Sequence, residues 1–176
     1  MRGGAPPAPG PATRGFTLIE ILVVVVILGV LAAAVTLAVG AAGGERQLAR
    51  QAEQMRALIG YACEQAELGG RDLGLSFDTI GYHFSVTERG DWVPNATVEL
   101  RARKWLRGLT ATLSRDGQPI AVTDNTPEKP QLVCFSSGEL TPFRLELALA
   151  DLATHYRIDG QPDGSVTLST VETRAR

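Results

Sequence analysis

One acidic side chain stands at the start of the longest apolar stretch in this 176-residue sequence. Glu20 is followed by residues 21–44, which are mostly Val, Leu, Ile, Ala and Gly and include no charged residue. An ionised carboxylate in the interior of a bilayer costs about 2.5–3.5 kcal/mol on insertion scales. Glu20 therefore requires a cationic partner, a proton, or a position from which its side chain reaches the membrane surface.

The apolar run after Glu20 is long enough to cross a membrane as a helix. A helix rises about 1.5 Å per residue, so about 20 residues span the roughly 30 Å hydrocarbon core. The alternative is the apolar part of a secretory signal peptide, which is usually about 7–15 residues long and precedes a small-x-small cleavage site. The length of the run and the position of Glu20 favour a transmembrane helix over residues 16–39.

The histidines do not form a recognisable catalytic or metal-binding pattern. His83 and His155 are the only two, and each lies in an expected strand, outside any metal-ligand spacing. The nucleophile motif Gly-x-Ser-x-Gly and a phosphate-binding glycine loop are also absent from the sequence. We therefore expect a protein that is not an enzyme and that uses no cofactor or metal.

Cys63 and Cys134 are the only cysteines, one in an expected helix and one in an expected strand. In an oxidising compartment they can form a disulfide that joins helix to sheet. The alternative is two buried free thiols that pack as small apolar side chains. Both alternatives stay open, because a bridge requires Cα atoms about 4.4–6.8 Å apart and the sequence does not show that distance.

Residues 40–70 are expected to continue the helix as an amphipathic segment. Apolar residues recur at spacings of three and four, which places them on one helical face, and two glycines at 69 and 70 supply a stop signal. These apolar residues are Leu48, Ala52, Met55, Ile59, Ala62 and Ala66. We expect this face to pack on a globular domain.

Residues 71–176 have the pattern of a β domain, because short runs of alternating or β-branched residues are separated by turn signals. The expected strands are Leu73–Asp78, Tyr82–Thr87, Trp92–Val93, Thr97–Leu100, Leu109–Ser114, Pro119–Val122, Leu132–Phe135, Phe143–Ala148, Thr154–Ile158 and Val166–Ser169. The fold class is therefore α+β, with a long N-terminal helix packed on an antiparallel β-sheet or β-sandwich domain.

The charge of the chain gives no indication of a nucleic-acid partner, since the net charge is −2. Two basic segments are exceptions: residues 101–107, which include Trp105, and the tail at residues 174–176. Such segments can bind phosphates or stack on single-stranded bases. The simpler interpretation is a solvated loop and a frayed terminus, so we expect nucleic acid not to be a partner.

The segment from Gly15 to Glu20, Gly-Phe-Thr-Leu-Ile-Glu, followed by the apolar run, resembles the processing site of type IV pilins and type II secretion pseudopilins. The resemblance implies that residues 1–15 are a prepilin-type leader, that a membrane peptidase cleaves after Gly15, and that the new N-terminal Phe16 is methylated. It also implies that Glu20 faces the N-terminal amine of a neighbouring subunit during assembly. That amine would be the cation that a carboxylate in lipid requires.

The β part is similar to the H-type minor pseudopilins of type II secretion, the GspH/FimT family. The residues that carry this resemblance are Phe135–Leu145, Tyr156, Asp159, Gly160, Gly81–Phe84 and Trp92. The resemblance implies a structural subunit of a periplasmic pseudopilus that takes part in the export of folded proteins across the outer membrane. It further implies a single-pass protein of the bacterial inner membrane with residues 71–176 in the periplasm.

The implied partners are the other minor pseudopilins, the major pseudopilin, and the prepilin peptidase that processes the leader. The alternative is a FimT-like minor pilin of a type IV pilus that binds DNA during uptake. The two hypotheses differ in their partner, and the basic tail at residues 174–176 is the feature that favours the second.

Overall fold

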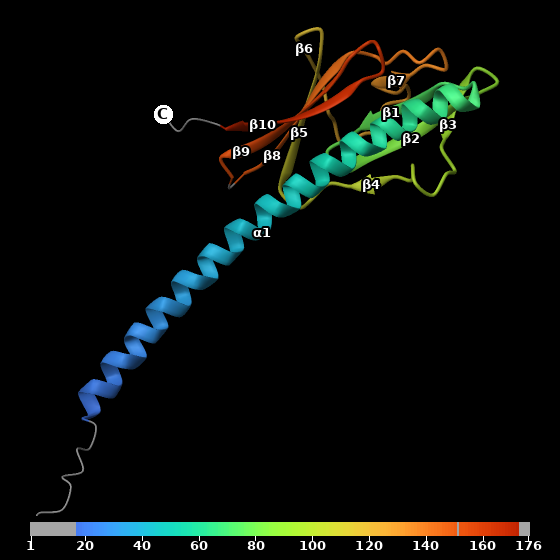
Figure 1. Cartoon of the computed structure of the whole chain (residues 1–176). Coiled ribbons are helices and arrows are strands. Elements are labelled where there is room, and N and C mark those ends of the chain that lie inside the picture. Colours follow the sequence, from blue (N-terminus) through green and yellow to red (C-terminus); the bar gives the residue numbers. More distant parts are fainter. Residues whose placement is uncertain (1–16, 151, 173–176) are drawn as a thin grey trace, which may run out of the picture. The chain divides into compact units, whose positions relative to one another are not determined.

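A long helix comes first in the chain and the strands follow it, as the computed structural model shows (Figure 1). It describes residues 17–150 and 152–172, without the side chains of residues 34–42. The elements are α1 (Leu18–Gly69), β1 (Leu73–Phe77), β2 (Gly81–Glu88), β3 (Asp91–Pro94), β4 (Arg103–Lys104), β5 (Leu109–Arg115), β6 (Gln118–Ile120), β7 (Leu132–Cys134), β8 (Phe143–Leu149), β9 (Thr154–Gly160) and β10 (Val166–Glu172). The chain divides into two units, Met1–Val39 and Gly40–Arg176.

The second half of α1 buries the apolar face that its sequence predicts. All six residues of that face are buried, none more than 2% exposed. The helix ends at Gly69, where Gly70 adopts a φ of 60° and the amide of Arg71 donates to the carbonyl of Ala66 at 3.3 Å. This is a glycine-terminated helix end, as the two glycines predict. Among the described residues, no helix is long and apolar enough to span a membrane.

Two antiparallel sheets follow α1 in the described part of residues 40–176. The first has the strand order β3-β2-β1-β7, with β4 also paired to β2, and the second has the order β10-β9-β8-β5-β6. The first sheet has β1 near its centre, and all five residues of that strand are buried. A Cβ atom at Gly74 of β1 would meet Pro130 and Ser85, so the loop before β7 covers the strand closely.

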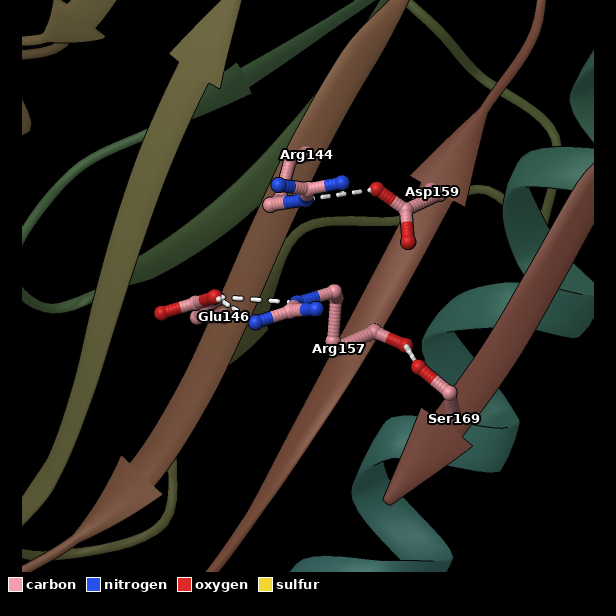
Figure 2. Close-up of polar contacts among 5 residues, drawn as sticks. All are labelled: Arg144, Glu146, Arg157, Asp159 and Ser169. Carbon is pink, nitrogen blue, oxygen red and sulfur yellow. Dashed lines mark hydrogen bonds and ion pairs between the residues drawn. The ribbon is translucent and has the colours of Figure 1, made fainter. Parts of the chain in front are cut away.

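In the second sheet, β8 alternates between the core and the solvent. Phe143, Leu145 and Leu147 are buried, as their spacing predicts. The outer face carries two cross-strand ion pairs, from Arg144 to Asp159 (2.8 Å) and from Arg157 to Glu146 (2.9 Å), which Figure 2 shows. Partly exposed pairs of this kind contribute at most about 1 kcal/mol each, so their main effect is on the register of β8 and β9.

The core of residues 40–176 is self-contained. The buried apolar residues of α1, of both sheets and of the intervening loops form one cluster, and every member lies at Leu48 or later in the chain. No described side chain of the first unit, residues 17–33, belongs to this cluster. We therefore expect residues 40–176 to fold without residues 1–39.

The expectation of a strand at Thr97–Leu100 is wrong. This segment forms a turn, in which the amide of Leu100 donates to the carbonyl of Thr97 at 3.2 Å and the amide of Thr97 donates to the Asn95 side chain at 2.7 Å. The last apolar residue of its alternating pattern, Leu100, is buried and packs the turn against the core. The sequence also did not predict β4, whose two basic residues pair with the start of β2.

Two glycine substitutions should shift the stability of residues 40–176 in opposite directions. A Cβ atom at Gly160 would collide with the Phe143 ring and with Leu140, whereas Gly60 of α1 has nothing within 4 Å of that position. We expect Gly160→Ala to lower the free energy of unfolding by about 1–3 kcal/mol through overpacking. Gly60→Ala should raise it by about 0.5–1 kcal/mol through helix propensity.

Urea unfolding of the two variants and of the parent measures this difference directly. Gly60→Ala is the matched control, because it adds the same methyl group to the same fold. Equal changes in the two variants would show that the packing around Gly160 is not as close as described.

Candidate functional site

Glu20 lies in the first turn of α1, three residues after Thr17, which caps the helix. The amide of Glu20 donates to the carbonyl of Thr17 at 3.1 Å and to the Thr17 hydroxyl at 3.3 Å. The spacing Thr-x-x-Glu is that of a capping box, and a carboxylate at this position interacts favourably with the helix dipole. The Glu20 side chain is exposed, and none of the ion pairs among the described residues includes it. Gly15 and Phe16 lie outside the described residues.

The turns of α1 that follow Glu20 expose apolar side chains in every direction. The large apolar residues between Leu18 and Leu31 are all strongly exposed, from 45% at Val24 to 84% at Leu18. An amphipathic helix would leave only one apolar stripe to be covered. Here no polar face exists, so exposure to water is unfavourable all round the helix.

Cys63 of α1 and Cys134 of β7 form a disulfide in the structure, with Cα atoms 4.8 Å apart. Both residues are buried, at the contact between the helix and the first sheet. The bridge closes a loop across a sequence separation of 71 residues. It joins the last turns of the helix to the short strand that lies beside β1.

The basic segment around Trp105 serves the fold. The Trp105 indole nitrogen donates to the carbonyl of Asp78 at 2.9 Å, and its ring stacks on Phe77 and lies 4.9 Å from the Tyr82 ring. A ring held in this way is not available to stack on a nucleotide base. Arg103 donates to the carbonyl of Glu99 at 3.0 Å. The tail at residues 174–176 lies outside the described residues.

Gln51 is a structural residue that the sequence analysis missed. It is buried on the apolar face of α1, where its side-chain nitrogen donates to the carbonyl of Lys104 (3.3 Å) and its oxygen accepts from the amide of Leu106 (3.1 Å). The two ends of the amide group therefore bind the last residue of β4 and the segment that follows it. A signal was present, because Gln51 stands three residues after Leu48 and so falls on the predicted apolar face.

Tyr82 lies against this same segment and has an unusual environment. Burial raises the pKa of Tyr82 to about 12, although the positive charge of Arg103 acts in the opposite direction. The hydroxyl group is buried and has no hydrogen-bond partner among the described residues. Its ring packs against Phe84 and Trp105, which accounts for its place in the core.

The two histidines lie in different sheets. His83 belongs to β2 and His155 to β9. Within residues 17–150 and 152–172, no group of three or more His, Cys, Asp or Glu side chains could hold a metal ion.

The N-terminal segment matches a known family model, the prokaryotic N-terminal methylation motif, over residues 11–36. The matched range includes Gly15, Phe16 and Glu20. Solved structures with the same fold include the minor pseudopilin EpsH from the type II secretion system of Vibrio cholerae, at a TM-score of 0.60 and 24% identity over 70% of this chain and 93% of that one. The solution structure of Escherichia coli GspH gives a TM-score of 0.55 at 20% identity, over 76% of this chain and 92% of that one. The described residues therefore share the fold of these two proteins, in which a long helix is followed by antiparallel sheets, and the methylation motif extends into the first turns of that helix.

Curated relatives define the family more closely. The type II secretion system protein H of Pseudomonas aeruginosa is 38% identical over 147 residues, which cover 78% of this chain and 84% of that protein. The protein of the same name from Aeromonas hydrophila is 30% identical over 165 residues, which cover 81% of this chain and 84% of the relative. The chain belongs to the family of type II secretion system protein H. This family supports the pseudopilin hypothesis over the FimT-like alternative.

Reduction of the disulfide should destabilise residues 40–176 strongly. Opening a loop of this length increases the chain entropy of the unfolded state, and the expected loss is about 4 kcal/mol. Urea unfolding with and without reductant measures the loss, and the control is the double variant Cys63→Ala/Cys134→Ala, whose stability should not depend on reductant. Alkylation of the unreduced protein should leave its mass unchanged; two added alkyl groups would show that the cysteines are free thiols.

Proposed function

We propose that this chain is a minor pseudopilin, a structural subunit of the periplasmic pseudopilus through which a type II secretion system exports folded proteins. The observation that carries the proposal is the 38% identity to a type II secretion system protein H across 78% of the chain. A function as a structural subunit also suits the described residues, whose polar and aromatic clusters serve the packing of the domain. The partners are the other minor pseudopilins and the major pseudopilin.

The proposal includes processing of the N-terminus. A prepilin peptidase removes residues 1–15 by cleavage after Gly15, and the new N-terminal Phe16 is methylated. The match of residues 11–36 to the methylation motif supports this step. Cleavage at that position leaves Thr17 in place, so the cap of α1 survives in the mature chain.

Residues 16–39 anchor the chain in the inner membrane as a single span, and residues 40–176 lie in the periplasm. The residue types of the two segments support this location. The sequence has no charged residue from Ile21 to Gly44, and the described side chains up to Leu31 are apolar on every side of the helix. A disulfide between Cys63 and Cys134 also suits the periplasm, because disulfides persist in oxidising compartments.

Glu20 aligns the subunit in the filament by pairing with the amine of a neighbouring N-terminus. Thr17 caps α1 by accepting from the Glu20 amide, which places Glu20 in the first turn of the helix, and a carboxylate there needs a cation once water is excluded. The processed amine of a neighbour lies four residues before its own Glu20, or about 6 Å along the helix, so an axial shift of about one helical turn between subunits brings the two groups together. Loss of one member of such a buried pair costs about 3–5 kcal/mol, because the other charge is left without a partner.

Replacement of Glu20 should therefore prevent assembly without preventing folding. We expect Glu20→Gln to be inserted in the membrane and cleaved, while its incorporation into the pseudopilus and the secretion that depends on it fall at least about tenfold. The matched control is Glu64→Gln, the same change at an exposed position of the same helix. The measurement is the amount of each variant in sheared filaments from cells that lack the parent gene. Normal incorporation of Glu20→Gln would refute the proposed role of Glu20.

A further inference from the structure

The first sheet carries a groove on the face that is turned away from α1. The side chains of Tyr82 and Phe84 belong to the core that β2 shares with the helix. Because side chains alternate along a strand, His83 and Ser85 face the other side of the sheet, together with Ser76 of β1, which is paired with His83. These three residues form the floor of a groove of about 560 Å³. Sites for small ligands are usually about 300–1,000 Å³.

Two walls border this outer groove. On one side lies β3, which contributes Trp92 and Pro94. On the other side lies the loop at residues 126–130, which contributes two further prolines. The loop is held against β1, because the side chain of Gln131, directly after it, accepts from the amide of Phe77 at 2.6 Å. Walls that are already in place reduce the entropy that a ligand loses on binding.

The polar groups on the floor of the outer groove are not used by the fold. Ser76 is only 3% exposed, yet its hydroxyl has no hydrogen-bond partner among the described residues. The side chains of His83 and Ser85 likewise make no hydrogen bond within the described part of the chain. Buried polar groups nearly always have a partner. The Ser76 hydroxyl therefore takes its partner from whatever occupies the groove.

Trp92 on the wall differs from Trp105, which the fold holds in place. The Trp105 ring contacts two other aromatic rings, and its indole nitrogen donates to a backbone carbonyl at 2.9 Å. Trp92 is only half-buried, and among the described residues it makes neither kind of contact. The face of a tryptophan ring attracts a cation placed within about 6 Å.

The charge of the outer groove is negative. Asp78 and Glu128 are among its lining residues, and no described lysine or arginine is. Glu128 is exposed, and none of the ion pairs between described residues includes it. One oxygen of Asp78 accepts from two backbone amides at 2.7 and 2.8 Å, while the other accepts only from the Thr126 hydroxyl at 3.4 Å. The complement of this surface is a cation.

We propose that the outer groove binds an arginine side chain presented by an extended segment of another protein. The guanidinium group stacks on Trp92, and the carboxylates of Asp78 and Glu128 compensate its charge. Arginine suits the groove better than lysine, because its planar group both stacks on a ring and matches a carboxylate with two donors. The apolar flanks of the segment lie between the proline-bearing walls.

Titration of the full chain, isotopically labelled and in a zwitterionic detergent, with the peptide acetyl-Pro-Arg-Pro-amide tests the proposal. The prolines keep this peptide extended at a low entropic cost. We expect a saturable NMR shift of the Trp92 indole signal, and a smaller shift of the Trp105 indole, whose N–H is already bonded. The neutral peptide acetyl-Pro-Gln-Pro-amide should bind at least about tenfold more weakly, because it offers no cation to the ring or to the carboxylates.

A matched pair of variants tests the part played by charge. Glu128→Gln should weaken binding of the arginine peptide about threefold to fivefold, as is usual for a partly exposed charge pair. Glu64→Gln, the same change at an exposed position of α1, should not alter it.

Equal affinity for the two peptides, no shift of the Trp92 signal, or no effect of Glu128→Gln would overturn the proposal. A Trp92 signal that moves with protein concentration before any peptide is added would also overturn it, since a second copy of the chain would then occupy the groove. Neither measurement requires secretion, so this inference and the proposed function can fail separately.

Discussion

The structure depends on α1, a single helix whose N-terminal and C-terminal parts have different surfaces. Between Ile21 and Leu31 the described surface of α1 is apolar all round, while beyond Leu48 only one face is apolar and that face is buried in the domain core. The domain is therefore complete without the first segment. The first segment, in contrast, has no polar face to present to water, so its stability in the cell requires lipid or other helices around it. This division is what a subunit needs if it is stored in a membrane and then assembled.

The elements with a strong hydrophobic period could be predicted from the sequence. The buried face of α1 followed from spacings of three and four, and the alternation of Phe143, Leu145 and Leu147 followed from a period of two. The segments without such a period were not predicted. Thr97–Leu100 alternates like a strand but closes a turn around buried Leu100, and β4 exists only because its backbone meets the start of β2. In both cases a tertiary contact decides the local structure.

The part of the candidate site that forms a short linear motif could be predicted from the sequence. The parts that depend on contacts between residues distant in the sequence could not. The segment from Gly15 to Glu20 could be recognised because its spacing is a linear motif. The relation of Cys63 to Cys134 stayed open until the Cα distance of 4.8 Å was known. Trp105 among arginines suggested base stacking, yet its ring is held by Phe77 and Tyr82, and only the packing shows this. The role of Gln51 could not be predicted, because its two backbone partners, Lys104 and Leu106, lie far from it in the sequence.

The central claim is that the chain becomes an assembly subunit when its leader is removed and a charged amine is created at the start of α1. Mass spectrometry of the N-terminal peptide, from protein purified out of cell membranes, tests this claim most directly. The account predicts a mature chain that begins with N-methylated Phe16 and contains no trace of residues 1–15. A mature chain that begins at any other residue, or that retains the leader in assembled filaments, would contradict it.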